Sequence, residues 1–307
     1  MHKKTAIMLL LLASLIWGAS FIAVKSLLSY ISINYILAVR FLAGTLALSV
    51  IFIKNRKDFT PKLFFRGALV GLVLYLAFMF QTWGLKYITS GKNALITALY
   101  VVIVPFLMWG FKKKRPNLRT ILAAFICFAG VGVLSSVSDV DSSMNITLEL
   151  FGLSLSGRGL ELFGIVLTSI SGVLFAVHIA IVAIYSEEHD VMNITFLQFL
   201  FAALFAFIAA SLLETFPPLL EFDSSVWLSL GYICILSTVV ALSLQNIGVK
   251  HAPPELASLV LCLESVFGCA LGIIILKEKL TTAVIFGSIL ILLSIIVSEY
   301  QPRKRRG

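Results

Sequence analysis

The sequence predicts an all-α integral membrane protein, with ten transmembrane helices arranged as two inverted five-helix repeats around a central cavity. Three observations lead to this fold class. Of the 307 residues, 60% are hydrophobic and 13% are charged, and the mean hydropathy is +1.04, whereas soluble domains are about 25% charged. The apolar residues form ten runs of spanning length. Segments of the two halves also align without gaps.

Each run is close to the 20 apolar residues that about 30 Å of hydrocarbon requires, because a helix rises about 1.5 Å per residue. Helices satisfy their own backbone polar groups in lipid, so runs of this length indicate helices. The first run has no clean small-residue cleavage site and is expected to be retained. The spans are predicted at residues 6–28, 33–53, 64–86, 93–111, 118–137, 159–185, 192–213, 225–249, 255–276 and 282–299.

Lysine and arginine residues set the expected orientation, because short loops rich in them stay in the cytoplasm. The net charge of +9 comes from basic clusters between apolar runs, which indicates topology and no nucleic-acid partner. With the N-terminus inside, the outer side holds only Lys86, Lys92, Arg158, Lys277 and Lys279. Both termini are therefore expected in the cytoplasm, and the multi-pass protein in the cell inner (plasma) membrane. The acidic loop at residues 187–190 falls inside and has no base of its own.

An internal repeat relates the two halves. The segment "FQTWGLKYITSGKNALITALYVVIVP" at 80–105 aligns with "LQNIGVKHAPPELASLVLCLESVFGC" at 244–269, an offset of 164 residues that matches Gln81 with Gln245. Similarly, "AVRFLAG" lies over "FLQFLFA" and places Arg40 opposite Gln198. Because five spans per copy is an odd number, the second copy must enter the membrane upside down.

Inverted repeats are typical of alternating-access transporters, which bind their substrate near the midplane where the repeats meet. The expected domains are a first five-helix repeat at residues 1–137, an extracytoplasmic linker at 138–158, and a second repeat with a basic cytoplasmic tail at 159–307. The linker is polar at first and then weakly amphipathic. The structural alternative is a duplicated bundle that transports nothing.

Four segments together resemble the EamA branch of the drug/metabolite transporter superfamily over nearly the whole chain. They are "LIWGASFIAVK" in the first span, "AVRFLAG" in the second, "GLKYITSGKNALITALYVVIVP" in the third and fourth, and "LCLESVFGCALGIIILKEKLTTAVIFGSILILLSIIV" in the ninth and tenth. The resemblance implies ten helices in two inverted halves, a central cavity, and export of small metabolites such as amino acids.

The resemblance also places Glu264 in the family's "LEPVF" stretch and Glu278 in its "GE" stretch. This sequence departs from the family with Ser265 where proline is usual and Lys277 where glycine is usual. The absent proline removes an argument for a kink in the ninth span. Related small multidrug pumps carry a proton-binding glutamate in their first helix, and this chain has none there, so their coupling mechanism is not implied.

Glu264 is the leading candidate for both substrate binding and proton coupling. It lies about nine residues into its span, roughly 14 Å from the cytoplasmic end. A charge at this depth costs at least about 2.5–3.5 kcal/mol, so the carboxyl group should face the protein interior. Alternatively, Glu264 bonds a neighbouring helix and fastens the bundle, near Gly268 and Gly272, which permit close helix contact.

Arg40 and Tyr100 are the next candidates for the cavity. Arg40 lies deep in the second span, where its planar guanidinium could bind a substrate carboxylate. It could instead extend toward the outer surface, or pair with Glu264 or a carbonyl group. Tyr100 aligns with Glu264 in the repeat, so the two side chains should face each other, with a ring for stacking and a hydroxyl for bonding.

Six further side chains complete the predicted cavity and its proton route. Trp17, Tyr75 and Trp83 suit an apolar or aromatic substrate, and the alternative for each is packing or contact with lipid. The matched amides Gln81 and Gln245 bind substrate or join helices. His178 suits proton transfer, or it is a hydrogen-bonded packing residue.

Pro105 should bend the fourth span and form a hinge, because proline removes a backbone hydrogen bond. The sequence has no GxxxxGK[ST] loop, no HExxH and no paired acidic clusters, so we expect no cofactor, no metal and no enzymatic activity.

These observations favour a secondary transporter that exports small metabolites, driven by a proton gradient or working by facilitated diffusion. The alternatives are a membrane-embedded enzyme acting on lipid-linked substrates, or a non-transporting scaffold subunit. The expected partners are the lipid bilayer and a small-molecule substrate, and the expected assembly is a monomer or homodimer.

Overall fold

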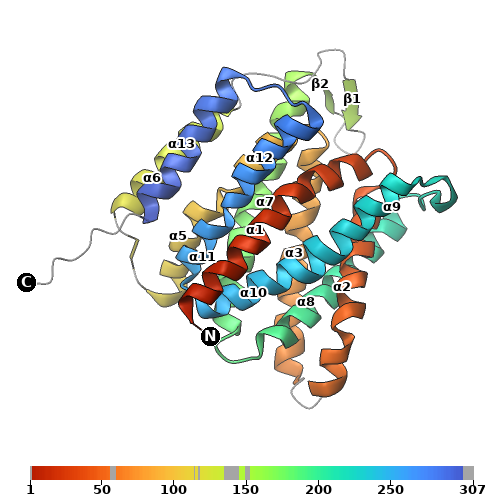
Figure 1. The fold of residues 1–307 in the computed structure, drawn as a ribbon, viewed down its shortest axis with the longest axis vertical. Coiled ribbons are helices and arrows are strands. Elements are labelled where there is room, and N and C mark those ends of the chain that lie inside the picture. The colour runs from red at the N-terminus through yellow and green to blue at the C-terminus, as the bar shows by residue number, and fades with distance from the viewer. Residues whose placement is uncertain are drawn as a thin grey trace, which may run out of the picture.

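The computed structural model describes residues 2–55, 60–113, 115–116, 118–134, 145–148 and 153–299. These residues form a helical bundle with one small hairpin (Figure 1). Eight stretches are long and apolar enough to cross a membrane, and they agree with eight of the predicted spans within a few residues. Large apolar side chains such as Leu46, Phe207 and Ile274 are exposed on the surface, as expected for a surface that faces lipid. The protein is a multi-pass membrane protein.

Five of the eight stretches are continuous helices: α1 (Lys3–Leu27), α2 (Ile33–Asn55), α3 (Pro61–Leu85), α7 (Arg158–Tyr185) and α8 (Val191–Leu213). The other three are interrupted. They consist of α4 (Ser90–Thr97) with α5 (Tyr100–Lys112), of α9 (Ser224–Gly231), the π-helix η4 (Tyr232–Val240) and α10 (Ala241–His251), and of α11 (Pro254–Leu261) with α12 (Leu263–Leu276). Shorter apolar helices lie within α6 (Leu118–Leu134) and α13 (Thr282–Glu299), and η3 (Leu219–Glu221) is a single 3₁₀ turn.

Local sequence explains where several helices begin. Thr60 caps α3 by accepting a hydrogen bond from the backbone N–H of Leu63, and Pro61 follows at the first helical position. Asp190 caps α8 in the same way through two backbone N–H groups. A capping oxygen satisfies N–H groups that have no partner within the helix, and proline at the first position sacrifices no bond.

Two of the interruptions fall at the same place in the repeat. α4 ends at Thr97 and α11 ends at Leu261, which is the same position after the offset of 164 residues. Tight i→i+3 bonds mark both breaks, such as Val101 N–H to Ala98 O at 3.0 Å and Ser265 N–H to Cys262 O at 2.9 Å.

The break in the fourth span is not at Pro105, where the sequence predicted a bend. Pro105 lies inside α5, about two turns beyond the break. The second half breaks at the matching point with Cys269 in place of this proline. The break is therefore set by local hydrogen bonding and packing, since the half without the proline has it too. The ninth span is interrupted although it has Ser265 where the family's proline is usual, and the Ser265 hydroxyl bonds the Cys262 carbonyl at the break, at 2.7 Å.

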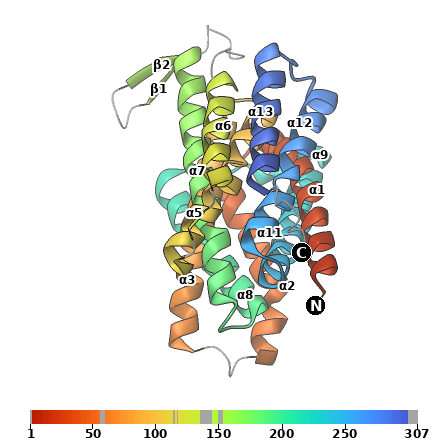
Figure 2. The ribbon, with the colours of Figure 1, turned by 90° about the vertical axis from the view of Figure 1, so that its left-hand side faces the viewer.

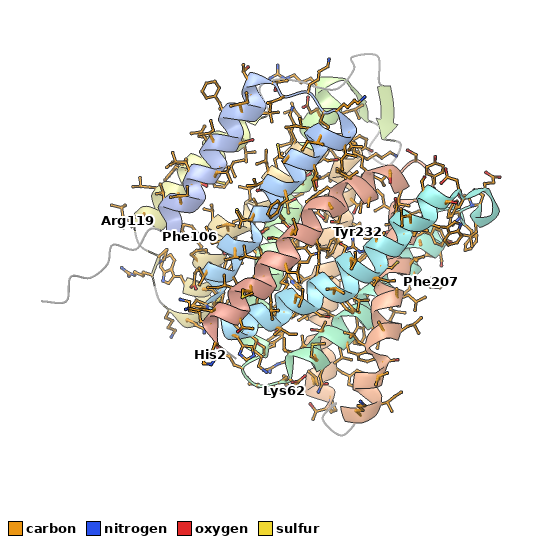
Figure 3. The ribbon with its side chains drawn as sticks, viewed as in Figure 1. His2, Lys62, Phe106, Arg119, Phe207 and Tyr232 are labelled. Carbon is orange, nitrogen blue, oxygen red and sulfur yellow. The ribbon has the colours of Figure 1, made fainter. Side chains whose placement is uncertain are left out.

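The tightest packing joins helices from different halves. α2 packs along α8, α6 along α13, α3 along α7, and α1 along both α10 and α12. The pair α6 and α13 forms one edge of the bundle (Figures 1 and 2). α1 starts at the lower end in these views, where the N-terminus is marked, whereas α7 starts at the upper end. Figure 3 places Lys62 at the same lower end as His2.

The segment between the halves contains a β-hairpin that the sequence analysis did not predict. β1 (Asn145–Leu148) pairs antiparallel with β2 (Leu153–Ser156), with Asn145 opposite Ser156. The second strand reads Leu-Ser-Leu-Ser, and this alternation has the period of a strand. The first part of the predicted linker lies outside the described residues.

Glycine permits the crossing of α1, α4 and α12. A Cβ atom added to Gly268 would lie 2.9 Å from the Ala94 Cβ and 3.2 Å from the Phe21 ring. No backbone shift of one helix alone would relieve both contacts. Gly268 thus fixes how closely the three helices approach.

We predict that Gly268→Leu lowers the melting temperature of the purified protein, because overpacking costs about 1–3 kcal/mol. The matched control is Gly110→Leu, since a Cβ atom at Gly110 meets nothing within 4 Å. Thermal denaturation in detergent measures both variants, and equal melting temperatures would contradict the packing account.

Candidate functional site

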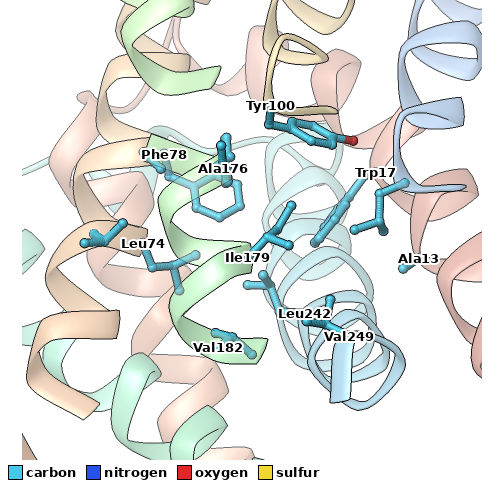
Figure 4. Packing of buried hydrophobic residues seen from close by; sticks show 14 of the residues in the cluster. Ala13, Trp17, Leu74, Phe78, Tyr100, Ala176, Ile179, Val182, Leu242 and Val249 are labelled. Carbon is cyan, nitrogen blue, oxygen red and sulfur yellow. The ribbon is translucent and has the colours of Figure 1, made fainter. Parts of the chain in front are cut away.

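A pocket lies between the two halves, and residues next to both matched breaks line it. About 380 Å³ of atom-free space lies among its side chains, part of it open to the exterior. In this conformation the whole pocket has room for little more than ordered water. The lining consists of Trp17, Ser20, Phe21, Phe78, Gln81, Tyr100, Phe175, Ile179, Gln245, Leu261 and Glu264. Figure 4 shows Trp17, Phe78 and Tyr100 gathered around Ile179.

Tyr100 and Glu264 meet in this pocket. Tyr100 is the first residue of α5 and donates its hydroxyl to Glu264 Oε1 at 3.3 Å. Glu264 lies in the first turn of α12 and is only 5% exposed. The free N–H groups of a helix start favour a nearby negative charge. The expectation that these repeat-related residues face each other is confirmed.

Arg40 lies outside the pocket lining and has other partners. Its Nε donates to Thr238 Oγ1 at 2.8 Å and its Nη2 to Ser237 Oγ at 3.2 Å, both on η4. The guanidinium carbon lies 4.2 Å from the centre of the Phe78 ring. Arg40 is 1% exposed, so it neither extends to the surface nor pairs with Glu264. It holds the π-helix instead.

The π-helix η4 holds one side chain of the pocket wall through a backbone carbonyl group. Trp17 donates its indole N–H to the Ser237 carbonyl oxygen at 2.9 Å. π-helical turns are rare and are often found at functional sites. Trp17, which lines the pocket from α1, is thereby fixed to the second half.

The matched amides line the pocket, and each is hydrogen-bonded to a side chain outside the lining. Gln81 donates to Thr97 Oγ1 at 3.3 Å, and Gln245 donates to His178 Nδ1 at 3.4 Å. His178 is fully buried, does not line the pocket, and has its Nε2 at 3.0 Å from Gln198 Oε1. The ring is therefore neutral, with its proton on Nε2, and it orients Gln245.

Tyr75 and Trp83 do not line this pocket, where the sequence predicted them. Tyr75 donates its hydroxyl to Asn34 Oδ1 at 2.8 Å. Trp83 packs edge-on against Phe163 with ring centres 5.8 Å apart. Both rings therefore contact other parts of the protein.

Six of the lining residues were not predicted from the sequence. Each lies three or four positions from another lining residue. Ser20 and Phe21 follow Trp17, and Phe78 precedes Gln81 by three. Residues at these spacings share a helix face. Once one residue of a face is known, the others follow. Leu261 precedes Glu264 by three in the same way, whereas the pair Phe175 and Ile179 on α7 had no such partner among the predicted cavity residues.

On the hairpin side, carboxylates of the second half cap helices of the first. Glu278 accepts from Ser90 N at 2.6 Å and Gly91 N at 3.0 Å, at the start of α4. Glu214 accepts from Asn34 N at 3.0 Å, near the start of α2. A negative charge at a helix N-terminus is favourable.

Lys92 is buried, although the sequence analysis placed it among the outer-loop residues. Its Nζ lies 2.5 Å from Glu161 Oε1, and both side chains are almost completely enclosed. Lys25 donates to the Ile88 carbonyl oxygen at 2.6 Å nearby.

At the opposite end, the acidic loop at 187–190 forms ion pairs with basic side chains of the first half. Lys62 and Arg66 both contact Glu188, and Lys112 contacts Glu187 at 2.9 Å. Hydrogen bonds from Arg66 and Lys62 lower the pKa of the Glu188 carboxyl to about 2. These exposed ion pairs contribute less to the stability of the contact between the halves than the partly buried helix caps and the buried Lys92–Glu161 pair.

The described residues contain no group of three or more His, Cys, Asp or Glu side chains that could hold a metal ion. The site is instead a pocket between broken membrane helices, with one carboxyl group among aromatic and amide side chains. This arrangement is typical of membrane transporters.

Comparison with known proteins identifies the family. The EamA-like transporter family matches residues 4–136 and 162–300, and the chain belongs to this family of membrane transporters. Two Archaeoglobus fulgidus proteins, each named "Uncharacterized transporter", are similar. One is 29% identical over 292 residues, covering 94% of this chain and 83% of the relative. The other is 27% identical over 282 residues, covering 91% of each.

A solved structure described as "Crystal structure of protein" has the same fold. It superposes with a TM-score of 0.69 and 16% sequence identity, covering 97% of each chain.

We predict that Lys92→Met or Glu161→Met alone destabilises the protein by about 3–5 kcal/mol, because each removes one member of a buried ion pair. The double variant should lose much less. Thermal denaturation of the four proteins in detergent tests this prediction, and additive losses would contradict it.

Proposed function

We propose that this protein is a secondary transporter that exports small metabolites, such as amino acids, by alternating access. The observation that supports this most is the pair of matched helix breaks, which bring Tyr100 and Glu264 into one pocket. Broken helices in corresponding positions of two halves mark the substrate site in many transporters. The family membership supports transport in general.

The proposed architecture has ten membrane-crossing helices, in which α6 and α13 also cross. Residues 1–137 and 159–307 are the two inverted repeats, joined by an extracytoplasmic linker at 138–158. The separate family matches to 4–136 and 162–300 support this division. So do the opposite starting ends of α1 and α7 in Figure 2.

Helix pairing gives the proposed two-fold relation further support. The second spans of the two halves, α2 and α8, pack together, and so do the fifth spans, α6 and α13. α1 packs on the third and fourth spans of the other half, and α7 packs on α3, α4 and α5. A two-fold axis in the membrane plane produces this pattern.

Alternating access requires that contacts between the halves break at one end at a time. At the hairpin end, the Glu214 and Glu278 caps and the buried Lys92 pair must separate for the pocket to open outward. At the other end, exposed ion pairs such as that of Glu188 must separate, together with packing contacts such as that of Arg66 on the Tyr185 ring. The short helices at the matched breaks can tilt, and Pro105 remains a predicted hinge in α5.

In the proposed mechanism, Glu264, Tyr100, Trp17, Gln81 and Gln245 contact the substrate. Arg40 and His178 act behind them as positioning residues, through η4 and through Gln245. Glu264 is the proposed proton-coupling residue, and His178 is a second candidate because one hydrogen bond separates it from the pocket. Facilitated diffusion is the alternative to coupling.

Two other functions fit the observations less well. A membrane-embedded enzyme acting on lipid-linked substrates would need clustered catalytic groups at one membrane face, and we therefore propose that the protein is not an enzyme. A scaffold subunit would not need a carboxyl group in a pocket.

We further propose the inner (plasma) membrane as the location, with both termini cytoplasmic. The basic residues at the end of the bundle where α1 starts support this orientation. The proposed partners are lipid and a small solute, with no nucleic acid, and the proposed assembly is a monomer or homodimer.

We predict that proteoliposomes containing the protein take up labelled amino acids, that an imposed proton gradient drives their accumulation, and that Glu264→Gln abolishes this drive. The variant removes the titratable group and keeps the shape of the side chain. Flux at several pH values with and without a gradient is the measurement.

The matched control is Glu221→Gln, which neutralises an exposed carboxyl group outside the pocket. A Glu264→Gln variant with unchanged gradient dependence would exclude Glu264 as the coupling group. Flux in the wild type that does not depend on the gradient would indicate facilitated diffusion.

A further inference from the structure

The charge of the pocket restricts what it can bind. Among the lining side chains in the described part of the chain, Glu264 is the only Asp, Glu, Lys, Arg or His. The nearby cation, Arg40, lies outside the lining, and its bonds run to Thr238 and Ser237. A solute carboxylate in the pocket would face Glu264 with no cation beside it.

Hydrogen-bond donors of the pocket wall are mostly occupied. The Trp17 indole N–H bonds Ser237, the Tyr100 hydroxyl bonds Glu264, and the Ser20 hydroxyl bonds the Trp17 carbonyl at 2.8 Å. The side-chain NH₂ group of Gln245 contacts both His178 and Asn246 at 3.4 Å. One amide hydrogen of Gln81 remains available.

Several hydrogen-bond acceptors of the pocket wall remain available to a ligand. Glu264 Oε2 and the side-chain carbonyl oxygens of Gln81 and Gln245 have no protein partner among the described residues. The amide orientations follow from the bonds that their NH₂ groups make. A ligand that satisfies three acceptors must present several N–H or O–H donors, and one ammonium group presents three.

Aromatic rings form most of the remaining wall. Trp17, Phe21, Phe78, Tyr100 and Phe175 line the pocket, and Phe78 meets Phe175 edge-on with ring centres 5.0 Å apart. Ring faces attract cations electrostatically, most strongly where water is excluded, and they also bind flat apolar groups. They offer nothing comparable to an anion.

We propose that the pocket selects solutes by an ammonium group, with Glu264 as its counter-ion, the Gln81 and Gln245 carbonyl groups as further acceptors, and the five rings around an aromatic or apolar body. A substrate carboxylate is not required. This inference rests on the proposed function, because it names the class of solute that the transporter would carry, and it assigns the primary substrate contact to Glu264 instead of Arg40.

The test is equilibrium binding to the full-length purified protein in detergent, measured by titration calorimetry. The probes are phenethylamine, 2-phenylethanol and 3-phenylpropionate, which share a ring and differ in charge. The amine should bind at least about tenfold more tightly than either other probe, the ratio expected for one charge-assisted hydrogen bond. Equal or tighter binding of 3-phenylpropionate would overturn the proposal.

Variants separate charge from shape. Glu264→Gln should lose about tenfold in amine affinity and keep its affinity for 2-phenylethanol, whereas Glu264→Asp should retain the preference for the amine. Glu221→Gln serves as the exposed control. Unchanged amine affinity in Glu264→Gln would overturn the proposal. If this variant does not fold, the wild-type probe series decides alone.

Binding in detergent does not require transport, so the two proposals fail separately. Amine binding without flux in proteoliposomes would contradict the transport proposal only. Flux of solutes that lack an ammonium group, with no preference for amines, would contradict this inference only.

Discussion

The hydrogen bond between Tyr100 and Glu264 is the interaction on which the rest of the site depends, because it joins the two broken helices of opposite halves. Lipid cannot satisfy an interrupted backbone, so such breaks persist only where protein or water encloses them. Here both breaks lie at the pocket, and the Ser265 hydroxyl occupies a carbonyl group next to one of them. The same enclosure that protects the backbone leaves a carboxyl group among aromatic rings, and these features together support the proposed binding site.

Charged groups elsewhere follow the same constraint. Lys92 is fully enclosed and has Glu161 as its partner, while Glu278 caps α4 and Glu214 caps α2. Each of these contacts joins one half to the other at the hairpin end. The opposite end is joined by exposed ion pairs, which contribute less. The polar contacts that join the two halves are therefore buried or partly buried at the hairpin end and exposed at the other. Separating the exposed ion pairs costs less free energy.

The spans could be predicted well because the bilayer fixes their length, and the Tyr100–Glu264 contact could be predicted because the repeat aligns these two residues. Tyr75 and Trp83 were predicted to line the pocket and do not, because composition does not reveal which side chains of a helix reach the pocket. Lys92 was expected among the outer-loop residues because its partner Glu161 is 69 positions away in the sequence. The breaks were missed because hydrogen bonds and packing set them, without a proline at the break in either half.

Labelling from one side of the membrane tests the central claim, that the two halves are inverted, most directly. Cysteines that replace His2, just before α1, and Arg158, the first residue of α7, occupy exposed positions at the starts of the first helices of the two halves. In a background without the four native cysteines, a membrane-impermeant maleimide should label His2→Cys only after the cells are permeabilised, and Arg158→Cys in intact cells. Labelling of both positions from the same side would contradict the inverted arrangement and the account built on it.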